Sequence, residues 1–464
     1  MIIQLDRRSD VPLQRQLFES IRAAILDGTL AAGTRLPPTR ELAAELRVSR
    51  NCVVNAFRYL AAQGLVLARS GGGTRVAALP LVRTRVPPST RPRRGRAGRH
   101  ARRIARIVTE ASSGRAGAFR PGVPAIDLFP LRTWRAIVAR QWRDATPLLA
   151  YGGASGLPAL REAIAAHAGA ARGVRCGAEQ VLIVNGAQQA IDLVARVLLE
   201  PGDTACIEEA CYPGARSAFA ATGAHVVAMP VAMSPRLVYV TPSHQYPLGT
   251  TMPLERRQEL VAWCAETGAW ILEDDYDSEL RHDGSRELPA IHALAKNAAV
   301  IYAGTFSHLL APALRLGFVI VPHDLLQAFE VMAAIAGRGP STIEQAVLAE
   351  FISRGHLERH VRRLRAVYAE REALLVSHLR NLGAVESIDG LGAGSHLVVR
   401  LRSESEERRV AKAAAAAGIE VPLVRDYGSG RGLILGYGST DAKAIQEGMA
   451  VLRASLSRRR TTSM

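Results

Sequence analysis

The 464-residue sequence predicts two folded domains of different class, joined by a linker. Residues 1–79 are expected to form a small helical domain with a two-stranded β-wing, a winged helix-turn-helix. Residues 120–464 are expected to form a large α/β domain with a mostly parallel central sheet. Helical spacing of apolar residues supports the first domain, and alternation of short apolar runs with helix-forming stretches supports the second. The composition changes sharply between them.

Composition places the chain among soluble proteins of the cytoplasm. Hydrophobic residues make up 48% of the chain, and no apolar run reaches the roughly 18 residues of a membrane-spanning helix. The start, MIIQLDRRSD, lacks the layout of a secretion signal. Five cysteines without a CxxC pair favour reduced thiols over a disulfide framework. We therefore expect a cytoplasmic protein without a membrane partner.

The net charge of +17 favours a polyanionic partner. Only three lysines are present, Lys296, Lys412 and Lys443, so nearly all of the positive charge comes from arginine. A coding bias explains the choice of arginine over lysine, but it does not explain the excess over acidic residues.

The first domain is predicted as three helices followed by two short strands. Leu13, Leu17, Ile21 and Ile25 recur at helical spacing in the first segment. Glycines and capping residues then delimit two further helical segments, and a triple glycine divides two extended runs. The expected segments are 12–28, 38–47 and 48–64 for the helices and 65–79 for the wing.

The third helix, opened by Ser49 as its N-cap, is the expected DNA-recognition helix. Its first residues, Arg50 and Asn51, would enter the major groove from the N-terminal end of the helix. Arginine can bond guanine through two hydrogen bonds, and asparagine can bond adenine in the same way. These residue types therefore suit direct contact with bases.

Phosphate contacts are expected on both sides of this helix. Arg35 and Arg40 lie before and at the start of the second helix, where the DNA backbone would be met. Gly72 and Arg75 belong to the wing, which would lie along the minor groove. Each arginine taken alone is equally well a solvated surface residue. Residues 12–77 as a whole, however, resemble the winged helix-turn-helix of the GntR family, which implies double-stranded DNA as a partner.

The segment between the two domains is rich in arginine. From Pro80 to Arg120 the chain holds twelve arginines and one acidic residue, Glu110, among several prolines and glycines. Such a segment cannot bury a core. We expect a mostly disordered linker over 80–119, with a short helix around 100–110.

The second domain contains short apolar runs separated by helix-forming stretches, a rhythm typical of a parallel α/β sheet. The candidate strands are VLIVNG, TACIEE, HVVAMP, RLVYVTP, AWILEDD, AVIYAGTF and GFVIVP. Its motifs resemble, in order, those of MocR-type transcription regulators of the GntR superfamily: YGGASGLPALREAI, IVNGAQQAIDL, EEACYPGAR, TPSHQYPLGTTM, ILEDDYDSEL and GTFSHLLAPALRLG. The resemblance covers essentially all of 120–464. It implies a fold-type I aminotransferase-like domain, pyridoxal 5'-phosphate as cofactor, and a homodimer.

The resemblance assigns the cofactor phosphate to the turn NGAQQA, and the chemistry of that turn agrees. Backbone amides of Gly186, Ala187 and Gln188 at a helix N-terminus form an anion-binding site. Further phosphate ligands, two hydroxyls and a guanidinium, are expected from Thr305, Ser307 and Arg315.

The resemblance also assigns the residues around the cofactor ring. Asp274 matches the aspartate that pairs with the pyridine nitrogen and keeps the ring protonated. Tyr276 matches the tyrosine that bonds the ring hydroxyl, Tyr212 matches the aromatic residue that stacks on the ring, and His244 belongs to the adjoining loop. Taken alone, Tyr212 would more often be a packing residue than a stacking platform. The acidic residues of 273–279 also suit a divalent metal or a solvated loop, but the order of the motifs favours the cofactor, and no metal site is predicted.

One residue departs from the family at the centre of the site. His308 stands where the family has the lysine that forms a Schiff base with the cofactor aldehyde. An imidazole cannot form that stable imine, and none of the three lysines is an obvious replacement. We therefore expect non-covalent binding of pyridoxal phosphate and assign no catalytic residue.

Two further departures concern the sheet and the substrate. Residues 229–238, between two predicted strands, are too few for the usual crossover of about ten or more residues, so these strands are expected to be antiparallel or misfitted. Many transaminases of this fold bind the substrate carboxylate with an arginine near the position of LILGYG. Here 433–435 are aliphatic, and Arg431 is offset.

Together these observations predict a dimeric transcription regulator. Its effector is expected to be pyridoxal phosphate or an adduct of it with an amine or amino acid. Two alternatives remain at this point. One is an enzyme that also binds DNA, either an aminotransferase or a dehydratase with His308 as base. The other is a cofactor-free dimerisation scaffold.

Overall fold

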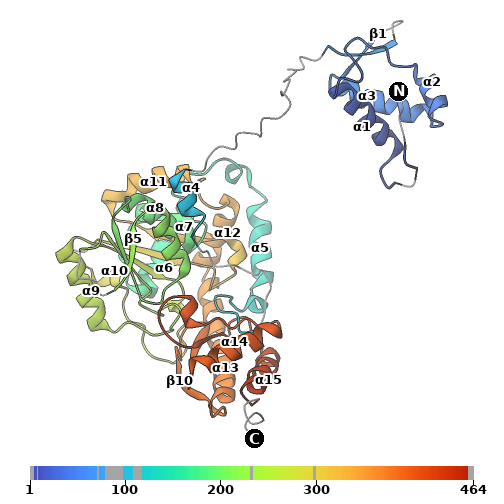
Figure 1. Cartoon of the computed structure of the whole chain (residues 1–464). Coiled ribbons are helices and arrows are strands. Elements are labelled where there is room, and N and C mark those ends of the chain that lie inside the picture. The colour runs from blue at the N-terminus through green and yellow to red at the C-terminus, as the bar shows by residue number, and fades with distance from the viewer. Residues whose placement is uncertain are drawn as a thin grey trace. The chain divides into compact units, whose positions relative to one another are not determined.

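The computed structural model describes residues 5–7, 9–69, 73–78, 98–107, 118–229, 234–295 and 299–457. The chain divides into two compact units, residues 1–96 and residues 97–464 (Figure 1). Most of the predicted linker, 80–119, and Gly72 of the predicted wing lie outside the described residues. Residues 98–107, with helix α4 (Arg99–Ile104), and residues 118–119 belong to the larger unit.

The smaller unit contains three helices and a two-stranded antiparallel wing. Its elements are α1 (Leu13–Leu26), α2 (Thr39–Glu45), α3 (Arg50–Ala62), β1 (Val66–Arg69) and β2 (Gly73–Val76). Leu17, Ile21 and Ile25 of α1 are buried against α3, as their helical spacing predicts. Val66 pairs with Val76 in the wing, and both are buried. The predicted winged helix-turn-helix is confirmed.

A seven-stranded sheet forms the centre of the larger unit, and each predicted strand is present in it. Its strands are β3 (Val181–Val184), β4 (Thr204–Ile207), β5 (His225–Ala228), β6 (Leu237–Val240), β7 (Trp270–Asp275), β8 (Val300–Thr305) and β9 (Gly317–Ile320). Their order is β3-β9-β8-β7-β6-β4-β5. Only β9 is antiparallel to its neighbours, so the prediction of a mostly parallel sheet is confirmed.

Helices cover both faces of this sheet (Figure 1). Along β6, Leu237 and Tyr239 join one apolar cluster, whereas Val238 and Val240 join another, so successive side chains face opposite layers. The helices of this part are α5 (Leu131–Gln141), α6 (Pro158–Arg172), α7 (Ala187–Leu198), α8 (Pro213–Thr222), α9 (Leu254–Thr267), α10 (Ile291–Leu294), α11 (Leu326–Ile335) and α12 (Thr342–Ser353).

The C-terminal part contains a second, antiparallel sheet. Its elements are α13 (His356–Arg380), β10 (Val385–Asp389), β11 (His396–Leu401), α14 (Glu404–Ala416), β12 (Leu433–Gly436) and α15 (Ala442–Ser457). Single 3-10 turns complete the described part: η1 (Ile126–Leu128), η2 (Thr146–Leu148), η3 (Ala178–Gln180), η4 (Ser278–Leu280), η5 (Pro312–Leu314), η6 (His323–Leu325) and η7 (Val424–Asp426). None of the helices that the described residues form is long and apolar enough to cross a membrane.

The expectation of antiparallel or misfitted strands around 229–238 is wrong. β5 and β6 both pair in parallel with β4, which lies between them. Because each strand has only four residues, it is about 13 Å long. The connection from 229 to 236 reaches about 26 Å when extended, which suffices to return along one strand and pass another. The expectation relied on the minimum of about ten residues for a parallel crossover, which applies to connections that contain a helix.

Candidate functional site

A cavity of about 470 Å³ lies where β6, β7 and β8 end. Parallel strands present their carboxyl ends at one edge of a sheet, which is where α/β proteins bind ligands. The cavity brings together most of the residues predicted from the sequence: Ala187, Gln188, Tyr212, Asp274, Tyr276, Thr305, Ser307, His308 and Arg315. Gly186 adjoins this set as the N-cap of α7, and His244 lies behind Tyr276.

One end of the cavity offers ligands suited to a phosphate. Gly186 precedes α7 with a φ of 82°, which turns the chain from β3 into the helix. The first amides of α7 have no acceptor inside the helix and point at this end. Arg315 donates to the backbone oxygen of Asn185 at 2.5 Å, which places the guanidinium beside the turn. The hydroxyls of Thr305 and Ser307 lie 3.1 Å apart at the end of β8.

Asp274, at the end of β7, has one oxygen bound and one oxygen without a partner. Tyr239 donates its hydroxyl to Oδ2 at 2.8 Å, whereas Oδ1 is buried with no hydrogen bond from any described residue. Burial raises the pKa of Asp274 to about 7. A protonated pyridine nitrogen against Oδ1 would satisfy this oxygen and stabilise the carboxylate. The pair of oxygens therefore fits a cofactor ring.

Tyr276 lines the cavity with its hydroxyl fixed from behind. Nδ1 of His244 lies 2.9 Å from Oδ2 of Asp277 and 3.0 Å from the Tyr276 hydroxyl. When the carboxylate of Asp277 accepts the hydrogen of His244 Nδ1, this nitrogen cannot accept the hydrogen of the Tyr276 hydroxyl. The Tyr276 hydroxyl is then free to donate its proton into the cavity. His244 contacts the Tyr276 hydroxyl from behind and is not among the residues that line the cavity.

His308 also lines the cavity, and its Nδ1 has no partner among the described residues. Its ring meets that of Tyr276 edge to face at 5.1 Å. Burial lowers the pKa of His308, and the charge of Asp277 offsets only part of this decrease. The imidazole is therefore neutral near pH 7. Lys412 and Lys443 are exposed on α14 and α15, and Lys296 lies outside the described residues.

Several lining residues were not predicted from the sequence. Tyr239 and Thr241 lie at the end of the strand RLVYVTP, and their place at a strand end is the sequence signal that could have found them. Tyr246 meets Tyr212 edge to face at 5.9 Å. Arg120 and Glu420 come from segments far apart in the chain and gave no pattern that could have been recognised.

The position of the transaminase arginine is apolar here. Leu433, Ile434 and Leu435 of β12 are buried, and Ile434 belongs to an apolar cluster with Tyr246 and Tyr276. Arg431 instead lies 3.0 Å from Glu386 and does not line the cavity.

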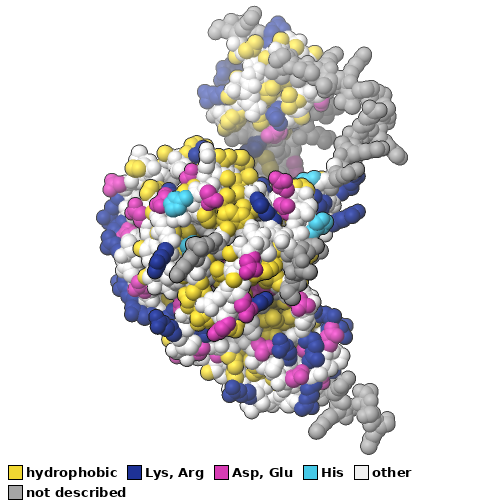
Figure 2. All heavy atoms as spheres, turned by 90° about the vertical axis from the view of Figure 1, so that its left-hand side faces the viewer, with side chains coloured by type: hydrophobic (Ala, Val, Ile, Leu, Met, Phe, Trp, Pro, Cys, Tyr) yellow, Lys and Arg dark blue, Asp and Glu magenta, His cyan; other side chains and the backbone are white. Residues whose placement is uncertain are grey.

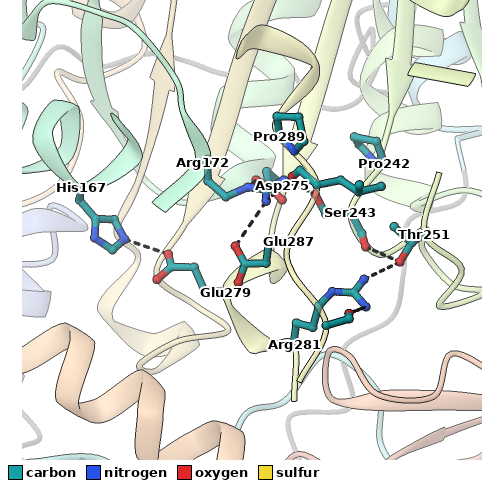
Figure 3. A network of polar contacts seen from close by, with 12 residues as sticks. His167, Arg172, Pro242, Ser243, Thr251, Asp275, Glu279, Arg281, Glu287 and Pro289 are labelled. Carbon is teal, nitrogen blue, oxygen red and sulfur yellow. Dashed lines mark hydrogen bonds and ion pairs between the residues drawn. The ribbon is translucent and has the colours of Figure 1, made fainter. Parts of the chain in front are cut away.

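Behind the cavity, a buried polar network holds the end of β7 (Figure 3). Arg172 at the end of α6 donates to Oδ2 of Asp275 at 2.7 Å and to the hydroxyl of Ser243 at 2.6 Å. Glu273 accepts from the backbone amides of 291 and 292. The acidic run of 273–279 therefore has protein partners on several sides. Among the described residues, no group of His, Cys, Asp and Glu could hold a metal ion.

In the smaller unit, the predicted DNA-contacting residues that the structure describes are all exposed: Arg35, Arg40, Ser49, Arg50, Asn51 and Arg75. The Ser49 hydroxyl accepts from the amide of Cys52 at 3.2 Å and so caps α3, which begins with Arg50. The backbones of Arg35 and Arg75 pair in an isolated antiparallel β-bridge, which brings the two residues close together. No described carboxylate forms an ion pair with these arginines.

Comparisons with known proteins agree with both units. Residues 13–76 match the bacterial regulatory proteins of the gntR family, and residues 127–426 match aminotransferase class I and II. The chain is 41% identical to the probable rhizopine catabolism regulatory protein MocR of Rhizobium meliloti over 98% of its own length and 96% of the relative's. It is 29% identical to the pyridoxine biosynthesis transcriptional regulator PdxR of Corynebacterium glutamicum, with 98% of each chain covered.

A solved structure gives the same fold for the larger unit. The α-aminoadipate aminotransferase LysN of Thermus thermophilus, complexed with N-(5'-phosphopyridoxyl)-L-leucine, is 28% identical to the chain with a TM-score of 0.69. The match covers 78% of this chain and 97% of that one.

Proposed function

Since the chain belongs to the MocR-type transcription regulators, in which a GntR-family DNA-binding domain is joined to an aminotransferase-like domain, we propose that its larger domain senses pyridoxal phosphate non-covalently. The effector is the cofactor itself or its adduct with an amine or amino acid. The aldehyde of pyridoxal phosphate supplies the group that captures an amine.

The observation that supports this proposal most is the combination of an unpartnered Asp274 oxygen with His308 in the same cavity. A phosphate at α7, a ring nitrogen at Asp274 and a ring hydroxyl at Tyr276 would each form a charge-assisted hydrogen bond. Such bonds contribute about 1.5–3 kcal/mol each, enough to retain the cofactor without a covalent bond. Tyr212 would cover the ring face, and the neutral His308 would face the aldehyde.

The chemistry of the fold relative supports the same assignment. LysN holds a phosphopyridoxyl amino acid in its structure, and the larger unit shares that fold. An effector of this kind would act on the DNA-binding domains through the linker 80–119 by shifting the population of their arrangements. The arginines of the linker would add contacts to DNA phosphates that do not depend on sequence.

The larger domain also supports a homodimer. Large hydrophobic residues are exposed on it, and Tyr151 is 96% and Ile335 71% exposed. Tyr151 lines a groove together with Trp142 and Leu149. On the face in Figure 2, hydrophobic side chains gather in a band, while cations and anions are interspersed around it. Contiguous exposed apolar surface is typical of protein–protein interfaces. Analytical ultracentrifugation tests this proposal, and we expect the mass of a dimer.

A second candidate function, an enzyme, is favoured by one observation. His308 is neutral near pH 7 and has a free Nδ1 in the cavity, which suits a general base. Turnover of amine substrates by protein supplied with pyridoxal phosphate, and its loss in His308→Ala, would support this function instead of sensing.

A gel-shift titration tests the sensing role. DNA from upstream of the protein's own gene is titrated with protein at fixed salt, with and without pyridoxal phosphate. We expect sequence-specific binding whose affinity or complex mobility changes with the cofactor, and no such change in Asp274→Ala. Weak, sequence-blind, salt-sensitive binding under all conditions would refute a regulator that responds to this ligand.

A further inference from the structure

We propose that Arg120 and Glu420 form an exchangeable ion pair that recognises the carboxylate of an amino-acid effector in the cavity. The inference rests on the proposed function, because it assigns a ligand class to the same cavity. Nε of Arg120 lies 3.5 Å from Oε2 of Glu420, and both residues line the cavity.

Arg120 is suited to this role by its place in the cavity. Of the lining residues, all of which the structure describes, only Arg120 and Arg315 carry a positive charge. Arg315 lies beside Gly186 and the turn into α7, where a phosphate would bind. Arg120 belongs to a different wall, which the C-terminal part of the molecule supports. A ligand with a phosphate at one end and a carboxylate elsewhere would therefore meet one arginine for each anion.

The backbone before Arg120 is fixed, which sets the position of its side chain. Phe119 is fully buried and has a positive φ of 63°. Its amide donates to Oγ1 of Thr440 at 3.0 Å, and its carbonyl oxygen accepts from the amide of Gly436 at 2.8 Å. These bonds thus fix the point from which the Arg120 side chain extends toward the cavity.

Glu420 is a partner that a ligand can replace. Its side chain is 41% exposed, whereas that of Arg120 is only 15% exposed. A carboxylate with this exposure gains little from the pair and regains full hydration when it is released. A ligand carboxylate that enters the cavity would take over Arg120, and Glu420 would turn to solvent.

The strand β12 offers no alternative cation. Leu433, Ile434 and Leu435 are buried and apolar, and Arg431 pairs with Glu386 away from the cavity. Phe119 is the last residue of the predicted linker, 80–119, and Arg120 directly follows it. Exchange of the Arg120 partner would therefore change contacts at the end of the segment that leads to the DNA-binding domain.

Two matched probes test the inference. They are N-(5'-phosphopyridoxyl)-L-leucine and N-(5'-phosphopyridoxyl)-3-methylbutylamine, which differ only by the carboxylate. Calorimetric titration of the full-length protein gives a Kd for each. We expect the leucine adduct to bind at least about tenfold more tightly than the 3-methylbutylamine adduct, because it gains a bidentate contact between its carboxylate and the arginine. Arg120→Gln should reduce the ratio to near one, and Glu420→Gln should keep or increase it.

Arg431→Gln is the matched control, since it removes an arginine of the same region that lies outside the cavity, and it should leave the ratio unchanged. Equal Kd values in the native protein, an unchanged ratio in Arg120→Gln, or a loss of preference in Arg431→Gln would overturn the assignment. Pyridoxamine phosphate is titrated into every variant. Its retained binding shows that Arg120→Gln is folded. Failure of the native protein to bind any of the three compounds would refute the proposed function itself, and this inference with it.

Discussion

At the residue scale, Asp274 is the group whose state depends most on the ligand. Burial raises its pKa from the ordinary value of 3.8 to about 7, and among the described residues only Tyr239 donates a hydrogen bond to it. In the ligand-free protein, a carboxylate without a cation is therefore disfavoured at neutral pH. A cofactor with a protonated ring would remove that penalty.

This pKa predicts how stability depends on pH. Between about pH 4 and pH 7 the folded state holds a proton on Asp274 that the unfolded chain has lost, so the free energy of unfolding falls as the pH rises. Asp274→Asn removes this dependence. We expect the free energy of unfolding of the ligand-free variant to be about 2–4 kcal/mol higher than that of the native protein at pH 8. At pH 4 the two values should be equal. Thermal unfolding across this pH range measures it, and parallel curves for the two proteins would contradict the assigned pKa.

Ser49 gives a second prediction at this scale. Its hydroxyl caps α3, and loss of such a cap costs about 1 kcal/mol. Ser49→Ala should lower the unfolding midpoint of the smaller unit and weaken DNA binding, because Arg50 and Asn51 occupy the first turn. Ser49→Asn, which caps equally well, should keep the midpoint. Equal midpoints for the alanine and asparagine variants would show that the cap is unimportant.

At the element scale, α4 is joined to α8 by the side chain of Arg103. The helix has six residues, too few to be stable alone. Arg103 donates to the backbone oxygen of Ala221 at 2.8 Å, at the end of α8, whose N-cap Tyr212 lines the cavity. We expect Arg103→Ala to abolish the protection of the α4 amides in hydrogen exchange. Arg102→Ala, which changes an exposed arginine of the same helix, should leave them protected. Equal protection in both variants would mean that α4 does not depend on this contact.

Strands and strand ends were predictable at this scale, but their directions were not. Continuous apolar runs identified each strand of the large sheet, whereas Asp274 and Thr305 were assigned through the resemblance of their motifs to the family. The antiparallel direction of β9 leaves no trace in periodicity, since a reversed strand buries the same residues. The pairing of β5 and β6 with β4 was missed because connection length was judged without knowing which strands are neighbours. The pair of Arg120 and Glu420 joins residues 300 positions apart, beyond any local pattern.

At the scale of the whole molecule, charge is concentrated outside the aminotransferase-like domain. Residues 80–119 contain eleven arginines and one acidic residue, so they account for more than half of the net charge of +17. We expect DNA binding to weaken steeply with salt, because each neutralised phosphate releases counterions. Arg50→Ala should reduce discrimination between operator and unrelated DNA. Replacing four linker arginines by glutamine should weaken binding to both kinds of DNA and lower the slope of log affinity against log salt concentration. Gel-shift titrations at several salt concentrations separate the two effects. An unchanged slope in the linker variant would show that the linker arginines do not contact DNA.

In the proposed function, the larger domain binds pyridoxal phosphate without a covalent bond because His308 replaces an amine. An absorbance titration of the native protein beside His308→Lys, each followed by borohydride reduction, tests it most directly. We predict saturable binding with the spectrum of the free aldehyde in the native protein, and covalent trapping only in the lysine variant. Absence of binding in both proteins would contradict the claim and identify the domain as a scaffold.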